Sequence, residues 1–497
     1  MVCTVVWLRY DLRLIDNPAL FHAAKRGHVV IIYILDQETP GKWKLGKASL
    51  WWLHHSLKSL QNDLLKFNIP LILRRGADPL TILRQVLLQS RADTVYWNRC
   101  YEPYAVKRDQ SIEEALKIDD VTVRSFQAGL LYEPWAIKSA KDEPFKLYIM
   151  YWNRCLSSDQ PRKPYDKPRF NNTLDIKVQT DTLDSWHLVS PKKDWKDELK
   201  TVIGCPGEDG AIRKLKEFIK YKLVDYRKGK ETVWPSKTSQ LSTHLHFGEI
   251  SPFVVWHTAK ESVHLRSVPS DSSQRFLTEF GWRDFCFHLL YYYPDFPEKS
   301  YKLNFDETIW KVDKEKLKLW QQGKTGYPIV DAGMRELLNT GVISYRVRTI
   351  VASFLTKHLL IPWQNGAEWF WDTLVDADLA LNSCSWQRIT GCGADSSSYF
   401  YIINPVTQGE RFDSDGNYVR KWIPEIAKLS NDYIQQPWEA PAAVLKKAGI
   451  ALGKTYPKCI VNHKKARDVA LTKFAPLKRQ EPMDKLKKLP SKKKMKK

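Results

Sequence analysis

The stretch TVVWLRYDLRLIDNPALFHAAKRGHVVIIYIL, residues 4–35, decides the architecture of the N-terminal part of the chain. It begins and ends with a short apolar run, and between the two runs the apolar residues recur with helical spacing. Five such apolar runs precede residue 135, at 4–8, 29–35, 70–73, 94–97 and 121–126. Strand runs that alternate with helical stretches are typical of a parallel sheet. We therefore expect an α/β domain over residues 1–135.

Downstream of this domain the pattern changes three times. Residues 136–210 contain polar text such as SSDQPRKPYDKPRFNNT (157–173), which predicts an interdomain connector on the surface. From 211 to 468 apolar residues recur three and four apart, which predicts a large all-α domain. Residues 469–497 form a basic tail that we expect to be disordered.

The charge balance indicates a polyanionic partner. The chain has 78 Lys plus Arg against 56 Asp plus Glu, a formal net charge of +22. The last twenty residues hold ten Lys or Arg and two acids, so most of the excess belongs to the rest of the chain. Such an excess favours binding to nucleic acid.

Several classes of protein are excluded. No apolar stretch approaches the roughly 20 residues that a membrane-spanning helix needs, and the charged residues Arg9, Asp11 and Arg13 interrupt the start in a way that a signal peptide does not. The eight Cys contain no CxxC pair, so we expect free thiols rather than a disulfide framework or a metal site.

Two segments contain residues suited to chemistry. The segment Thr238-Ser239-Gln240-Leu241-Ser242 opens an apolar helical stretch, and hydroxyls at a helix start suit either a phosphate or ordinary N-capping. The segment LVDADLALNSCSW (374–386) holds acids in an apolar context, which require partners. Arg346 and Arg348 lie two apart and face different sides of a helix. Structural ion pairs explain such charges as well as an active site does.

Taken in order, these segments and four others resemble the photolyase and cryptochrome flavoprotein family over about residues 2–463, most closely a class I-like cyclobutane pyrimidine dimer photolyase. The resemblance implies a Rossmann-like α/β domain for an antenna chromophore and a helical domain that holds FAD. The matching segments are VVWLRYDLRLIDNPAL, TSQLSTHLHFGEISP, FLTEFGWRDF, WQQGKTGYPIVDAGMREL, RVRTIVASF, and LVDADLALNSCSW through YFYIINPVTQGERFD.

The resemblance assigns residues to the cofactors. It implies that the FAD phosphates are held by Tyr226, Thr238, Ser239, Leu241 and Ser242. Arg348 and Asp376 match an ion pair beside the flavin ring, Asp378 its polar edge, and Asn382 the residue that faces flavin N5. The active flavin of repair enzymes in the family is reduced and anionic, and Arg348 would stabilise that charge. Glu102, with Asn98 and Lys299 nearby, matches an acid that binds a 5,10-methenyltetrahydrofolate antenna.

The resemblance also assigns an electron path. Trp386, Trp363 and Trp310 match a three-tryptophan chain that carries an electron from the protein surface to FAD. Without the resemblance, core packing is the ordinary interpretation of three such residues.

On the substrate side, Glu279 and Trp282 match residues that hydrogen-bond to and stack on a flipped pyrimidine dimer, and Arg283 and Arg346 are expected at DNA phosphates. The family's dimer photolyases usually have Asn, Met and Trp where this chain has Tyr345, Thr349 and Arg388. Tyr345 and Arg388 could still contact DNA through a ring, a hydroxyl or a guanidinium. Cys286, Cys384, Cys392 and Cys459 lack the close pair of an iron–sulfur site.

The sequence therefore predicts a deoxyribodipyrimidine photo-lyase, a carbon–carbon lyase that acts on ultraviolet-damaged DNA in light. It is expected to be a monomer in the cytoplasm at the nucleoid, or in the nucleus of a eukaryote. The main alternative is a cryptochrome-type photosensor, favoured by Tyr345, Thr349 and Arg388, and a second is a DNA-binding flavoprotein without repair activity. A (6-4) lesion is less favoured, because its photolyases usually carry His in the segment occupied by 342–345.

Overall fold

The computed structural model describes residues 2–170, 177–189, 204–265, 268–305, 310–396 and 401–479. The chain forms two compact units. The first unit comprises Met1–Pro294, Arg335–Arg346 and Glu368–Asn382, and the second comprises Asp295–Met334, Val347–Ala367 and Ser383–Lys497. The boundaries expected at 135, 210 and 468 stay predictions.

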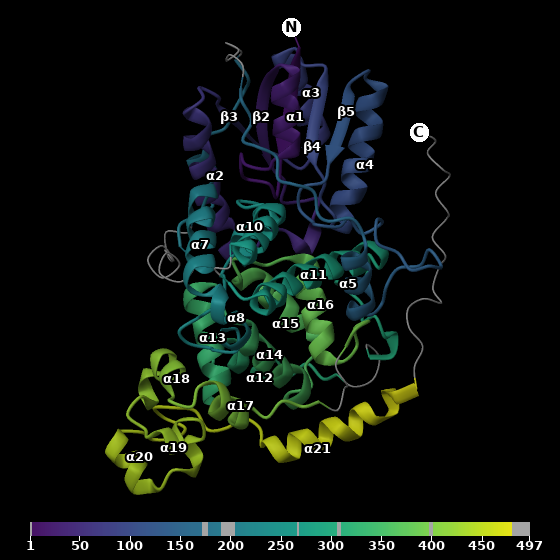
Figure 1. Ribbon diagram of the computed structural model, residues 1–497. Coiled ribbons are helices and arrows are strands. Elements are labelled where there is room, and N and C mark those ends of the chain that lie inside the picture. The colour runs from purple at the N-terminus through teal and green to yellow at the C-terminus, as the bar shows by residue number, and fades with distance from the viewer. Residues whose placement is uncertain are drawn as a thin grey trace. The chain divides into compact units, whose positions relative to one another are not determined.

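The first unit contains a five-stranded parallel sheet, as the apolar runs predicted (Figure 1). In chain order the strands are β1 (Cys3–Leu8), β2 (His28–Leu35), β3 (Leu71–Arg75), β4 (Thr94–Asn98) and β5 (Thr122–Phe126). They lie side by side in the order β3-β2-β1-β4-β5. The order reverses between β1 and β4, and in such sheets a crevice opens at the carboxyl ends of the strands at that point.

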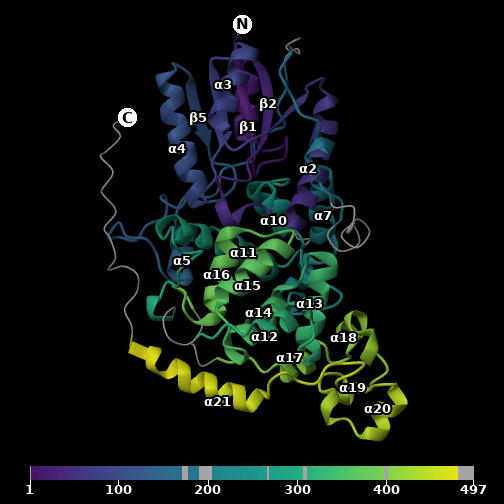
Figure 2. The same cartoon turned by 180° about the vertical axis from the view of Figure 1, so that it is seen from behind.

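Helices cover both faces of this sheet (Figures 1 and 2). The helices are α1 (Pro18–Arg26), α2 (Lys47–Leu65), α3 (Pro79–Ser90) and α4 (Pro103–Ile118). Because successive strand residues point to opposite faces, Val6 and Leu8 of β1 pack with α1 and α2, whereas Val5 and Trp7 pack with α3 and α4. The continuous apolar runs of the sequence follow from this two-sided burial.

A helix lies within the expected connector. Helix α5 (Tyr148–Ser157) buries Tyr148, Tyr151 and Trp152 and packs on α11 (Ser270–Tyr292). Gly281 of α11 makes room for this contact, since a Cβ at this position would collide with the ring of Trp152. The connector is therefore partly a packed element, a feature that its polar composition did not reveal.

The first unit also contains α7 (Glu208–Tyr221), α8 (Tyr226–Gly229), α9 (Ser242–His246) and α10 (Pro252–His264). Helices α13 (Pro328–Thr340), α14 (Tyr345–Ser353), α15 (Trp363–Thr373) and α16 (Leu379–Thr390) each belong partly to both units. The described residues after 204 are mainly helical, as expected.

The second unit contains α12 (Lys314–Gln321), the π-helical turn η5 (Phe354–His358), α17 (Pro405–Phe412), α18 (Asn417–Trp422), α19 (Asn431–Ile434), α20 (Ala442–Ala448) and α21 (His463–Phe474). Helix α21, yellow in Figure 1, continues six residues past 468, so the start of the expected tail is helical. Residues 480–497 lie outside the described part. None of the helices among the described residues is long and apolar enough to cross a bilayer.

Candidate functional site

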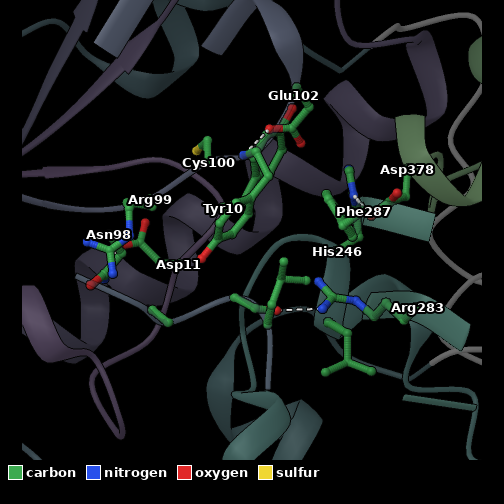
Figure 3. A pocket seen from close by; sticks show the side chains of 15 residues that line it. Tyr10, Asp11, Asn98, Arg99, Cys100, Glu102, His246, Arg283, Phe287 and Asp378 are labelled. Atoms are coloured by element: carbon green, nitrogen blue, oxygen red, sulfur yellow. Dashed lines mark hydrogen bonds and ion pairs between the residues drawn. The ribbon is translucent and has the colours of Figure 1, made fainter. Parts of the chain in front are cut away.

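A polar pocket lies at the carboxyl ends of β1 and β4, where the strand order reverses (Figure 3). Its cavity measures about 40 Å³. Tyr10 and Asp11 follow β1, and the segment 98–102 closes β4 and enters α4. The remaining polar lining comes from later elements of the same unit and consists of His246, Arg283 and Asp378.

The carboxyl groups of this pocket are held in different states. Burial raises the pKa of Glu102 above its ordinary value, and the charge of Asp378 raises it further. Burial also acts to raise the pKa of Asp378, but the nearby His246 and Arg283 outweigh it, and the pKa lies below its ordinary value. The ring Nδ1 of His246 lies 3.9 Å from Asp378 Oδ2. The pKa values of the two carboxyl groups are therefore shifted in opposite directions, that of Glu102 upward and that of Asp378 downward.

Arg283 points into this pocket. Its Nη1 donates to the backbone oxygen of Gly129, and its guanidinium lies 5.2 Å from the ring centre of Phe287. Only 13% of the side chain is exposed. The guanidinium is thus engaged inside the protein, and the expected contact of Arg283 with a DNA phosphate stays a prediction.

The expected folate residues are only partly suited to a ligand. Glu102 lines the pocket, but the Asn98 amide is fully used by the protein: it donates to Asp11 (2.6 Å) and Asn17 (2.8 Å) and accepts from the Ala19 N–H (3.2 Å). Lys299, which belongs to the second unit, pairs with Asp295 at 3.0 Å. Of the three residues predicted to bind the antenna, Glu102 is thus the one whose carboxyl group faces the pocket.

The expected phosphate segment surrounds the start of α9. The N-cap residue is Leu241, whose side chain provides no cap, so ordinary side-chain N-capping is not what the hydroxyls do here. Thr238 contacts Ser236 through its hydroxyl (3.0 Å), and Ser239 accepts a long hydrogen bond (3.4 Å) from the Leu241 N–H. Ser242 is exposed, whereas Tyr226 is buried against Phe218 and Phe276.

The residues expected at the flavin ring offer a suitable set of polar groups. Asp378 accepts from the Leu381 N–H (3.0 Å) and so fixes the start of α16, and Asn382 follows with 8% exposure. Arg348 and Asp376 are each half-buried, in different units. His246 adds a buried Nε2 with no protein partner among the described residues. Within the first unit, an amide, a carboxylate and an imidazole fit the donors and acceptors of a flavin nucleotide.

The two residues expected at the lesion share one face of α11. Glu279 and Trp282 lie three apart, which places them next to each other on the helix. The Glu279 side chain is 41% exposed and its carboxylate lies 3.4 Å from Lys230 Nζ. Trp282 is half-buried and stacks on Tyr148, with ring centres 3.8 Å apart and planes 13° apart. Reasoning from the sequence missed Tyr148.

The other expected DNA residues have varied surroundings. Tyr345 is 61% exposed, whereas Arg346 forms an ion pair with Glu231. Arg388, in the second unit, lies 3.8 Å from Asp395. Both arginines are therefore partly neutralised by acids of the protein itself, and Thr349 is buried.

The three tryptophans of the expected electron path belong to the second unit and are linked by backbone elements. Trp363 begins α15, and Gly366, one turn later, lies against the ring of Trp386. The residue after Trp310 donates its N–H to the Leu360 oxygen at 3.1 Å, three residues before Trp363. The order Trp386, Trp363, Trp310 thus runs through neighbouring elements, and Trp310 is the most exposed of the three.

Comparison with known proteins identifies the family. The profile described as DNA photolyase matches residues 4–169, and the profile described as FAD binding domain of DNA photolyase matches residues 276–476. A deoxyribodipyrimidine photo-lyase of Agrobacterium fabrum is 45% identical, over 96% of this chain and 98% of the relative. The chain belongs to the DNA photolyase family.

Relatives of this chain include proteins named photo-lyase and proteins named cryptochrome. Cryptochrome-1 of Arabidopsis thaliana is 36% identical, over 94% of this chain and 69% of the relative. A solved structure of a bacterial class III photolyase from Agrobacterium tumefaciens is 44% identical with a TM-score of 0.92, over 96% of this chain and 98% of that chain. The expectation of a class I-like photolyase is not supported, because this similar structure belongs to class III.

Proposed function

We propose that this photolyase-family protein is a class III-type deoxyribodipyrimidine photo-lyase that splits cyclobutane pyrimidine dimers in light. The observation that carries the proposal is the pair formed by Glu279 and Trp282 on one face of α11, with an aromatic ring beside a partly exposed carboxylate. The name and similarity of the Agrobacterium fabrum relative support it. We expect the protein to act as a monomer in the compartment that holds the DNA.

The lesion side combines stacking and hydrogen bonding. A dimerised pair of bases stacks and pairs poorly, so flipping it out of the duplex costs less than flipping normal bases. The Trp282 ring offers a stacking surface of about 1–3 kcal/mol per base. The Glu279 carboxylate accepts hydrogen bonds and therefore suits the N–H groups of pyrimidines.

The flavin side is built from residues of the helical part. When bound, FAD supplies the light-excited electron donor that the repair needs. Arg348 and Asp376 balance charge beside the ring, Asp378 and Asn382 offer an acceptor and an amide, and the phosphates fit the hydroxyl-rich segment 238–242 near Tyr226. Trp386, Trp363 and Trp310 relay electrons between the protein surface and this site.

The polar residues at the end of the sheet mark the proposed position of the antenna. We place a folate-type chromophore against Glu102, whose raised pKa favours a neutral carboxyl that can donate a hydrogen bond. Absorption of the purified protein near the folate band, lost in Glu102→Ala but kept in Asn98→Ala, tests this placement.

A repair assay tests the main proposal. The reduced protein is illuminated with an oligonucleotide that contains one cyclobutane dimer, and repair is expected in light only. Trp282→Ala and Glu279→Ala should reduce repair and leave the flavin content unchanged. Loss of flavin in either variant would contradict the separation of the two sites. Binding should weaken with salt, with a log–log slope near −0.9 per phosphate neutralised.

A cryptochrome-type photosensor is the second candidate. Tyr345, Thr349 and Arg388 stand where dimer photolyases usually carry other residues, and the similarity to a plant cryptochrome favours it as well. A protein that binds flavin and is photoreduced, but neither binds nor repairs the dimer, would support the sensor. Dimer binding without repair would support a DNA-binding flavoprotein.

A further inference from the structure

A column of aromatic rings lies under Trp282 in the first unit. Tyr148 stacks on Trp282 with ring centres 3.8 Å apart, and Trp152 follows with its plane 11° from that of Tyr148 and its centre 6.5 Å away. Trp256 of α10 closes the column edge-on at 6.1 Å. Two nearly parallel rings, Tyr148 and Trp152, therefore stand behind the residue proposed to stack on the lesion, and the edge-on ring of Trp256 follows them.

Tyr148 is held in place independently of Trp282. Its hydroxyl donates to the Thr278 oxygen at 2.8 Å, one turn before Trp282 on α11. Burial, followed by the charge of Glu279, raises the pKa of this phenol far above its usual range, so the hydroxyl keeps its proton and remains a donor. The first residue of α5 is thus fixed to the helix that carries Glu279 and Trp282.

We propose that Tyr148 is a positioning residue for lesion recognition, which covers one face of the Trp282 indole and fixes the ring so that a flipped base meets it in a single orientation. This inference rests on the proposed role of Trp282. It adds to that role a residue from α5, 134 positions earlier in the chain.

The physical reason is preorganisation. A half-buried Trp side chain without a stacking partner has several rotamers, and a ligand must order it at a cost in affinity. A stacked aromatic pair removes that freedom before DNA arrives, and such pairs contribute enough for about a 2- to 10-fold change in binding. The effect should fall on lesion-containing DNA and spare binding to undamaged DNA, which depends on charge.

The test uses the full-length, flavin-loaded protein in the dark. Binding to a single-stranded oligonucleotide with and without one cyclobutane dimer is measured by fluorescence anisotropy. Tyr148→Leu should weaken lesion binding about 2- to 10-fold and leave undamaged binding unchanged. Tyr148→Phe, which keeps the ring and loses the hydroxyl, should retain more lesion binding than Tyr148→Leu. Trp256→Phe is the matched control, because it alters the far end of the column without touching Trp282.

The outcomes separate the two proposals. Unchanged lesion binding in Trp282→Ala contradicts the proposed function, whereas a loss in Trp282→Ala with none in Tyr148→Leu overturns the positioning role alone. An equal loss in Trp256→Phe and Tyr148→Leu also overturns it, since it would show a general packing effect. If Tyr148→Leu does not fold, fluorine NMR of the wild-type protein labelled with fluorotryptophan tests whether the Trp282 ring has a single orientation. Trp282, assigned with Trp282→Phe, should give one signal in the free protein, and two exchanging signals overturn the proposal.

Discussion

Each of the two units contains an array of aromatic side chains, and the two arrays differ in their exposure to solvent. In the first unit Trp282, Tyr148 and Trp152 stack nearly parallel, and Trp282 remains partly exposed. In the second unit Trp320, Trp363 and Trp386 are at most 2% exposed. Trp320 meets Trp386 edge-on at 6.3 Å. The first array suits the binding of another ring, whereas the second is closed to ligands.

The indole N–H groups of the second unit support this distinction. Trp363 donates to the Ser300 hydroxyl at 3.0 Å, Trp320 donates to the Val351 oxygen at 3.0 Å, and Trp310 donates to the Phe305 oxygen. Groups satisfied inside the protein are not needed for recognition. An enclosed array of oxidisable rings suits electron transfer, which needs no ligand at the rings.

The largest expected effect is the loss of flavin photoreduction, without loss of lesion binding, when a tryptophan of the second array is replaced. Trp363→Phe should nearly abolish light-driven reduction of the bound flavin, because the middle of the proposed electron path is removed. Lesion binding in the dark should stay unchanged, since the first unit is untouched. The measurement is the flavin absorption change under blue light, with Trp438→Phe as the control, since Trp438 lies in the same unit and its ring contacts Tyr327, which is not part of the proposed path. Normal photoreduction in Trp363→Phe would show that the path runs elsewhere.

The next largest effect is expected on the pH dependence of stability, and it comes from a buried lysine in the second unit. Lys357 of η5 is buried, its Nζ lies 3.9 Å from the ring centre of Phe474, and burial lowers its pKa to about 7. Cys392 and Lys302 are the charged or titratable neighbours that modify this pKa. The folded state therefore disfavours the protonated amine: the cost is full below pH 7 and disappears above the ordinary pKa of 10.5.

Replacing this lysine should flatten the pH dependence of stability. Relative to Lys357→Met, the wild-type free energy of unfolding should rise between pH 7 and pH 10 by up to about 4 kcal/mol. Urea unfolding at several pH values measures the difference, and Lys318→Met, at an exposed lysine of the same unit, serves as the control. Parallel stability curves for wild type and Lys357→Met would show that the amine is charged at all these pH values.

A buried acid in the first unit should give the opposite pH dependence. Asp284 directly follows Arg283 on α11, and burial raises its pKa to about 7 against the lowering effect of Arg283. The folded state here disfavours the ionised carboxyl, so the cost is absent below the ordinary pKa of 3.8 and full above pH 7. Relative to Asp284→Asn, wild type should lose up to about 4 kcal/mol between pH 4 and pH 7.

The same urea series checks this second curve. Asn keeps a carbonyl oxygen for the Tyr132 N–H, which donates to Asp284 at 2.9 Å, so the variant should still fold. A wild type that gains stability over this pH range relative to the variant would show that the carboxylate is better stabilised than its burial implies.

The sequence predicted the sheet better than the site. The strands β1 to β4 were predictable because a strand that is buried on both faces of the sheet needs consecutive apolar residues. Helix α5 was missed because polar segments flank it in the sequence, although its own residues, YIMYWNRCLS, are largely apolar. Its buried face is partnered by α11, more than a hundred positions away. The inward direction of Arg283 was also missed, since only the folded chain shows that its guanidinium meets Gly129. Tyr148 carried no signal besides its aromatic type.

The smallest expected effects come from substitutions at two glycines. At each glycine, the missing side chain allows a tryptophan ring to pack directly against the helix backbone. A Cβ on Gly281 would collide with Trp152 in the first array, and a Cβ on Gly366 would collide with Trp386 in the second. Overpacking of this kind costs about 1–3 kcal/mol and shifts the ring. Gly281→Ala should lower lesion binding and leave photoreduction unchanged, and Gly366→Ala should do the reverse. Thermal unfolding, the binding assay and the photoreduction assay on both variants test this, and an equal loss of both activities in one variant would show that the two arrays are not independent.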